Sequence, residues 1–91
     1  MPVLVIAEVP NVTAEQDDAM VEALNLASDP PAGARLRLAG PTENGWRIMS
    51  LWDSQESFEA FRRDRLIPAL EQAGRPAPDV QFWPIERVVI R

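Results

Sequence analysis

The sequence predicts a single α+β domain, residues 1–91, with elements in the order strand, helix, strand, strand, helix, strand. Three observations lead to this class. Runs of apolar, β-branched residues open and close the chain. Two amphipathic segments begin with helix-capping residues. A turn containing Asn44 and Gly45 lies between two short strand-like segments and predicts a hairpin.

The first strand is predicted over residues 2–9, "PVLVIAEV", where β-branched residues dominate. Both faces of this strand are apolar, which is typical of a central position in a sheet. Glu8 is the exception, since it shares a face with Leu4 and Ile6. A helix follows over residues 12–28, where Thr13 and Gln16 form a capping box. Its apolar stripe consists of Met20, Ala23, Leu24 and Ala27.

The central hairpin is predicted from residues 34–40, "ARLRLAG", and residues 46–53, "WRIMSLWD". Leu36 and Leu38 alternate with polar or small residues, which indicates a strand covered on one face. The loop between the strands is short, so the two strands should pair antiparallel.

The second helix is predicted over residues 53–74, with Asp53 or Ser54 as its N-cap and Gly74 as its terminator. Pro68 lies inside this helix and should kink or split it, because proline lacks a backbone donor. The buried stripe consists of Phe58, Phe61, Leu66 and Leu70. The arginines at positions 62, 63 and 65 are expected on a solvated helix face.

The last strand is predicted over residues 80–90, "VQFWPIERVVI". Pro84 cannot donate to a strand ladder, so this strand should lie at an edge or carry a bulge. Right-handed crossovers then place both helices on one face of a four-stranded antiparallel sheet, with the first and third strands central. This is the ferredoxin-like βαββαβ arrangement. The opposite face stays apolar, and pairing with a second copy would hide it in a dimeric α+β barrel.

Composition restricts the function. The formal net charge is −5, which argues against a nucleic-acid partner. Histidine, cysteine, lysine and tyrosine are absent. Zinc sites of the usual kind, catalytic triads and phosphate-binding Walker loops are therefore not expected, and no cofactor or metal is predicted. The opening residues lack the features of a signal peptide and are too short to cross a bilayer, which favours a cytoplasmic protein with no membrane partner.

Two charged residues lie on strands among apolar neighbours. Glu8 and Arg37 each require a partner, because an unpaired buried charge is very costly. One interpretation is structural, with Glu8 paired to Arg35, Arg37 or Arg47. The other is catalytic, with Glu8 as a base and Arg37 as the clamp of a phenolate or enolate.

Trp46, Ser50 and Trp52 share one strand face, which suits either a packed core or a small-molecule pocket. A helix kinked at Pro68 would leave space over that face. Phe58, Phe61 and Leu66 would then line the pocket beside the two tryptophans. Asn11, just before the first helix, suits a turn.

The stretches "VIAEVPNVTAEQ", "AGPTENGWRIMSLWDSQESFEAF" and "RLIPALEQAG" make the chain resemble small dimeric α+β-barrel proteins related to antibiotic-biosynthesis monooxygenases. The resemblance covers nearly the whole chain. It implies a homodimer and a small-molecule pocket, with Asn11 and Trp52 in the positions of residues implicated in substrate and oxygen chemistry. Relatives of this short type often carry histidine where this chain has Arg37.

The resemblance implies a cofactor-independent monooxygenase acting on an aromatic, polyketide-like substrate. Two alternatives remain open: a non-catalytic ligand-binding or interaction module of the same fold, and a cyclase-like barrel. The absence of histidine, tyrosine and cysteine favours the binding module, because these are common acid–base groups.

Overall fold

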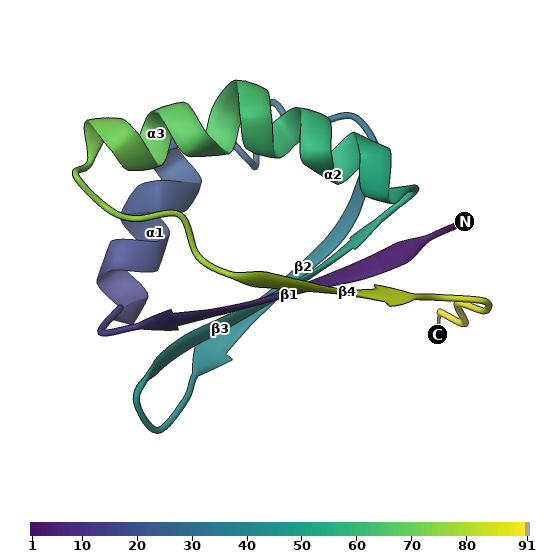
Figure 1. The fold of residues 1–91 in the computed structure, drawn as a ribbon, viewed down its shortest axis with the longest axis horizontal. Coiled ribbons are helices and arrows are strands. Elements are labelled where there is room, and N and C mark those ends of the chain that lie inside the picture. Colours follow the sequence, from purple (N-terminus) through teal and green to yellow (C-terminus); the bar gives the residue numbers. More distant parts are fainter. Residues whose placement is uncertain (91) are drawn as a thin grey trace.

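The computed structural model describes residues 1–90 and consists of one antiparallel sheet with a helical layer on one face (Figure 1). The strands, in chain order, are β1 (Val3–Pro10), β2 (Ala34–Pro41), β3 (Gly45–Trp52) and β4 (Val80–Pro84). Their order in the sheet is β2-β3-β1-β4. The predicted βαββαβ fold is therefore confirmed, with the first and third strands central and the second and fourth at the edges.

Helix α1 (Ala14–Ala23) begins with the predicted capping box. The Gln16 backbone N–H donates to Thr13 Oγ1 at 3.2 Å, and the Thr13 N–H donates to Gln16 Oε1 at 3.0 Å. The helix ends five residues earlier than predicted, at Ala23 instead of Ser28. Asn25 has a φ of 54°, in the left-handed region, which is incompatible with continuing a right-handed helix.

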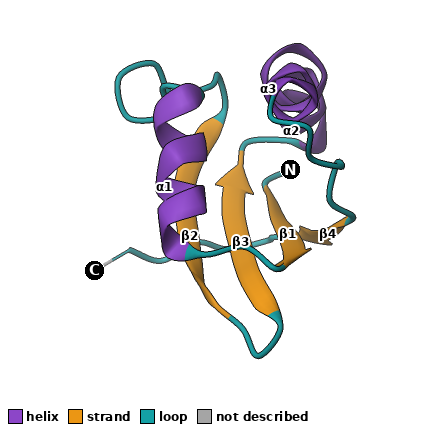
Figure 2. Cartoon of the chain, turned by 90° about the vertical axis from the view of Figure 1, so that its left-hand side faces the viewer, coloured by secondary structure: helices purple, strands orange, loops and turns teal. Residues whose placement is uncertain are grey.

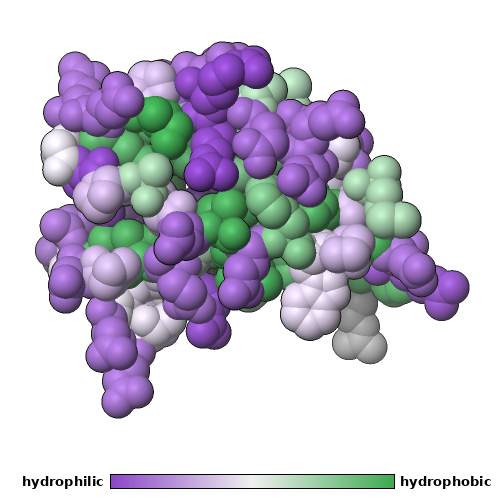
Figure 3. All heavy atoms as spheres, viewed as in Figure 1, coloured by the Kyte–Doolittle hydropathy of each residue, from purple (hydrophilic) through white to green (hydrophobic). Residues whose placement is uncertain are grey.

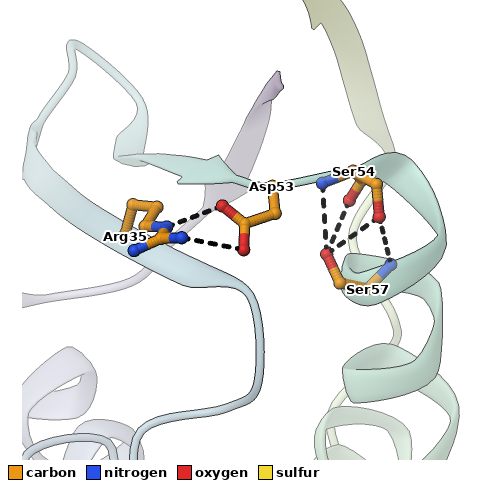
Figure 4. Close-up of polar contacts among 4 residues, drawn as sticks. All are labelled: Arg35, Asp53, Ser54 and Ser57. Carbon is orange, nitrogen blue, oxygen red and sulfur yellow. Dashed lines mark hydrogen bonds and ion pairs between the residues drawn. The ribbon is translucent and has the colours of Figure 1, made fainter. Parts of the chain in front are cut away.

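The second helical segment comprises α2 (Gln55–Phe61), a π-helical turn η1 (Arg62–Leu66) and α3 (Ile67–Gln72). Ser54 is its N-cap, and Ser57 completes the capping box (Figure 4). Asp53, the alternative cap, instead receives two hydrogen bonds from the Arg35 guanidinium at 2.6 and 3.1 Å.

Pro68 does not split this segment, which runs on as one slightly irregular rod (Figure 1). The turn before it is widened, so that the Ile67 N–H donates to the carbonyl of Arg62, five residues back. A widened turn relieves the crowding that a proline ring causes in the preceding α-helical turn. Gly74, with a φ of 69°, then ends α3 as predicted.

The hairpin register decides which β2 residues face the helices. Arg37 pairs with Ser50, and a bulge between Ala34 and Leu36 places Ala34 opposite Trp52. Directly opposed residues project to the same face. Arg37, Ser50 and Trp52 therefore all lie on the helix-covered face, whereas Leu36 and Leu38 lie on the other.

Strand β4 is shorter than predicted and stops at Pro84 instead of Ile90. Its pairing with β1 ends with Pro84 opposite Val3, and one further hydrogen bond joins the Ile85 N–H to the Pro2 carbonyl. A proline at the strand end removes a ladder donor. Val88, Val89 and Ile90 consequently lie outside the strand, with exposures of 47, 80 and 86%.

The core lies between the sheet and α2. Val3, Val5, Trp52 and Phe58 are its buried members. The Trp52 and Phe58 rings meet edge to face, with centroids 5.4 Å apart and an interplanar angle of 75°. These contacts fix the start of α2 over the end of the sheet where β1 begins and β3 ends.

Within residues 1–90 no helix covers the other face of the sheet (Figure 2). Leu36, Leu38 and Trp83 on this face are 52, 50 and 63% exposed. The chain exposes 6529 Å² in all, whereas a compact monomer of this mass typically exposes about 5,300 Å². We name this the open face; its apolar members are Leu4, Ile6, Leu36, Leu38, Met49, Leu51 and Trp83.

None of the helices among residues 1–90 has both the length and the apolar character that crossing a bilayer requires.

Candidate functional site

A cavity of about 580 Å³ lies between the sheet and the helical layer. Figure 2 shows α1 on one side of this layer and the α2–α3 rod on the other. Apolar side chains are visible between a mostly hydrophilic helix surface and the sheet in Figure 3. The volume is within the range of ligand pockets, about 300–1,000 Å³.

One wall of the cavity is aromatic. Trp52 from β3 and Phe58 and Phe61 from α2 all border it. The Trp52 and Phe61 centroids are 5.3 Å apart with an interplanar angle of 35°. Leu66 from the π turn extends this wall. The structure thus brings together four of the residues proposed from the sequence, and the flat rings of the three aromatic ones suit a planar apolar ligand.

The opposite wall carries an ion pair that the sequence did not reveal. Arg37 on β2 donates to Asp17 on α1 through both terminal nitrogens, at 2.7 and 3.1 Å. The Asp17 side chain is only 8% exposed and that of Arg37 is 29% exposed. A buried bidentate pair of this kind holds α1 against the edge strand and places two opposite charges at the cavity wall.

Ser50 lies between the two walls. Its hydroxyl oxygen accepts a hydrogen bond from the Trp52 indole Nε1 at 2.8 Å. Ser50 also stands opposite Arg37 in the hairpin register. The serine therefore orients the indole, and its own hydroxyl proton remains available for a group inside the cavity.

Asn11 borders the same cavity at the end of β1. Its φ is 60°, a conformation that asparagine adopts more readily than most residues. Its backbone N–H donates to the Asn44 carbonyl at 3.1 Å, which ties the strand end to the hairpin loop. Asn11 is thus a turn residue that also lies beside the cavity.

Two candidate residues lie apart from this group. The strand at Glu8 borders the cavity, but strand alternation directs its side chain to the open face, where Arg47 binds the carboxylate. Trp46 shares the face of Trp52 but lies nearer the hairpin, opposite Val9, and does not itself border the cavity. Its buried indole nitrogen has no hydrogen-bond partner among residues 1–90.

Arg65 does not lie on a solvated helix face, which corrects that expectation for one arginine of the run. Its guanidinium donates to the carbonyls of Leu24 and Asp29, and it lies 5.7 Å from the Phe61 ring centroid. The π turn directs Arg65 toward the end of α1, where Leu24 has free carbonyl capacity. Arg65 therefore links the two helices beside the aromatic wall.

Electrostatics at the sheet edge are dominated by Arg35 and Asp53 (Figure 4). Hydrogen bonding from Arg35 holds the pKa of the Asp53 carboxyl below its ordinary value, and Asp53 raises the pKa of Arg35. Among residues 1–90 no group of three or more acidic or other metal-binding side chains could hold a metal ion.

Comparison with known proteins finds similar folds but no matching sequence family. No family model and no curated protein matches the chain. The fold is similar to that of Rv0793 from Mycobacterium tuberculosis, with a TM-score of 0.66 and 17% identity over 98% of this chain and 100% of that one. It is also similar to a candidate antibiotic biosynthesis monooxygenase from Chloroflexus aurantiacus J-10-fl, with a TM-score of 0.64 and 20% identity over 100% of both chains. The likeness inferred from the sequence is thus confirmed at the level of the fold.

Proposed function

We propose that the chain binds a flat, largely apolar small molecule in the cavity between its sheet and its helices. One observation carries this proposal: aromatic side chains, an ion pair and a hydroxyl group together line a cavity of about 580 Å³. A ring system packs well against Trp52 and Phe61, while an oxygen substituent meets Ser50 or Arg37. An ordinary packed core would fill this space with side chains.

The test is a cavity-filling substitution. Leu66→Trp inserts an indole into the cavity and should weaken the binding of naphthalene and larger aromatic ketones by about tenfold or more in isothermal titration calorimetry. Val89→Trp adds the same side chain at an 80% exposed site and serves as the control. Equal affinities in the wild type, Leu66→Trp and Val89→Trp would show that the ligand does not occupy the cavity.

A second candidate function is cofactor-independent oxygenation of the bound aromatic. The name of the Chloroflexus aurantiacus neighbour and the position of Asn11, Trp52 and Arg37 around one cavity favour it. An anthrone-type substrate supplies all the electrons, because its CH₂ group reacts with O₂ to give a ketone and one water. Asn11 and Trp52 would orient oxygen and ring, and a guanidinium N–H of Arg37 that Asp17 does not use would donate a hydrogen bond to the ketone oxygen of the substrate.

Oxygen uptake separates catalysis from binding. An oxygenase consumes one O₂ per anthrone and forms the quinone, and Trp52→Phe should slow this turnover with little loss of binding. Ligand binding without oxygen uptake or a changed product would instead support the non-catalytic module. A cyclised product from an open polyketide chain would support the cyclase-like alternative.

We also propose that the chain forms a homodimer through the open face. The exposed leucines of β2 and Trp83 of β4 support this, because apolar side chains of all four strands lie on the open face and span it from one edge strand to the other. The paired side chains of Glu8 and Arg47 would lie inside such an interface. The excess of exposed surface over that of a compact monomer points the same way.

Sedimentation velocity at micromolar concentration tests the homodimer. The wild type should sediment as a dimer, and Leu38→Asp should shift it to a monomer, because an unpaired carboxylate at an apolar interface is costly. Gln55→Asp adds the same charge at the exposed start of α2 and should leave the dimer intact. A monomeric wild type would contradict this proposal while leaving the cavity unaffected.

A further inference from the structure

The ion pair of Arg37 and Asp17 lies at the cavity wall and changes the charge that a bound molecule would meet there. A lone arginine in an apolar pocket is a site for an anion, because its charge is otherwise uncompensated. Here the carboxylate of Asp17 already occupies both terminal nitrogens of Arg37. Asp17 is 8% exposed, so water compensates its charge poorly and the arginine cannot leave it without a large loss.

The remaining charged residues that line the cavity are acidic and basic in equal number. Besides Asp17 and Arg37, its lining includes Glu8 and Asp79 of one sign and Arg35 and Arg75 of the other. Glu8 is bound by Arg47 and Arg35 by Asp53. Asp79 and Arg75, of opposite sign, both belong to the segment between α3 and β4. No excess charge of either sign therefore faces a bound molecule from the described residues of this lining.

The pair nevertheless offers hydrogen bonds. A guanidinium has five N–H groups, and Asp17 receives two of them. Each carboxylate oxygen of Asp17 keeps a free lone pair, and the Ser50 hydroxyl proton is available beside them. A carbonyl oxygen can accept from Arg37 or Ser50, and a hydroxyl group can donate to Asp17.

We propose that Asp17 and Arg37 form a specificity-determining pair that selects an uncharged oxygen substituent, a ketone or a neutral phenol, on the aromatic ligand. The pair disfavours the corresponding carboxylate or ammonium group, because either would lose its hydration without meeting a compensating charge. This inference rests on the proposed binding function and specifies the chemical class of the ligand.

The experiment compares four probes of one ring system by calorimetry at neutral pH: naphthalene, 2-acetylnaphthalene, 2-naphthoate and 2-naphthylmethylammonium. In the wild type the ketone should bind about tenfold more tightly than either ion. Asp17→Asn leaves Arg37 uncompensated and should raise the affinity for 2-naphthoate relative to the ketone by about tenfold. Arg37→Gln leaves Asp17 uncompensated and should favour the ammonium probe in the same way.

The outcomes are distinct. Asp64→Asn, in an exposed pair with Arg63, makes the same chemical change away from the cavity and should leave all ratios unchanged. If the wild type binds naphthalene but does not prefer the ketone, the selectivity proposal is wrong and the binding function stands. If no probe binds, both fail. Should Asp17→Asn not fold, the wild-type ratios and Arg37→Gln still decide the matter, and unchanged ratios in folded variants overturn the proposal.

Discussion

Asp17 is the residue whose role was hardest to predict from the sequence. It precedes Met20 and Leu24 by three and seven positions, so it continues the apolar stripe of α1 by one turn. A carboxylate on that stripe signals a buried charge in need of a partner. The partner, Arg37, lies twenty positions away on β2, and only the hairpin register brings it under the helix. Patterns within one element do not reveal that pairing.

The aromatic wall also stabilises the fold. Phe58 is 4% exposed and contacts Trp52, Phe61 and Phe82, with ring centroids 5.4 to 6.4 Å apart. Phe58→Ala should lower the free energy of unfolding by about 3–5 kcal/mol, the usual cost of emptying such a site. Urea denaturation followed by circular dichroism measures this loss. Val89→Ala, at an exposed site, is the control, and equal midpoints for the two variants would contradict the assignment of Phe58 to the core.

The pair of Arg35 and Asp53 gives stability a defined pH dependence. The pKa of Asp53 is lowered in the folded protein, chiefly by its hydrogen bond from Arg35. The pair therefore stabilises the fold above the ordinary carboxyl pKa, and its contribution is lost as the pH falls through the lowered value. Wild type and Asp53→Asn should differ in stability near pH 6 and converge toward pH 2.

The Arg35→Gln background is the control for this prediction. Without the guanidinium the Asp53→Asn substitution should have no comparable pH-dependent effect, because the cause of the shift is gone. Chemical denaturation across the pH range gives both comparisons. A difference that persists undiminished at pH 2 would rule out the ion pair as its source.

At the scale of elements, the π turn η1 explains how apolar residues with irregular spacing all lie on one buried face of the α2–η1–α3 segment. Phe58, Phe61, Leu66 and Leu70 are separated by three, five and four positions. An α-helix cannot place the five-residue step on one face, whereas a π turn absorbs the additional residue. The spacing was thus a readable sign of the π turn, and Pro68, two positions beyond it, is compatible with the same widened geometry.

Deleting the exposed Arg63 tests this explanation. The deletion changes the spacing to three, four and four, which an ordinary α-helix buries on one face. The variant should therefore fold and melt within about 5 °C of the wild type, a change of roughly 1 kcal/mol. Deleting Glu59 instead disturbs the spacing of Phe58 and Phe61 and should cost more than about 2 kcal/mol. Equal losses in the two deletions would show that the π turn does not act as an insertion.

At the scale of the whole molecule, the sheet has two different surfaces. Element order, capping residues and Pro84 at an edge were enough to predict the fold, because each is a local signal with one compatible topology. The surfaces were less predictable. The alternation in β2 placed leucines opposite arginines but did not say which set the helices cover, and the structure puts Arg37 inside and Leu36 and Leu38 outside.

The placement of Glu8 follows from the same choice of faces. A one-residue change of register would move its carboxylate from the open face to the cavity. The pairing of Glu8 with Arg47 across β1 and β3 sets it on the open face, so the polar chemistry of the cavity falls to Asp17, Arg37 and Ser50. Sequence alone identified Arg37 and Ser50 as candidates but not the residue that neutralises the arginine.

The three tryptophans provide the most direct test of ligand binding in the cavity. Trp52 borders the cavity, Trp83 lies on the open face, and Trp46 lies near the hairpin. In a ¹⁵N–¹H correlation spectrum each indole gives one signal, assigned by Trp→Phe variants. Titration with 2-acetylnaphthalene should shift the Trp52 signal saturably and leave that of Trp83 in place. A saturable shift at Trp83 with none at Trp52 would contradict the cavity as the ligand site.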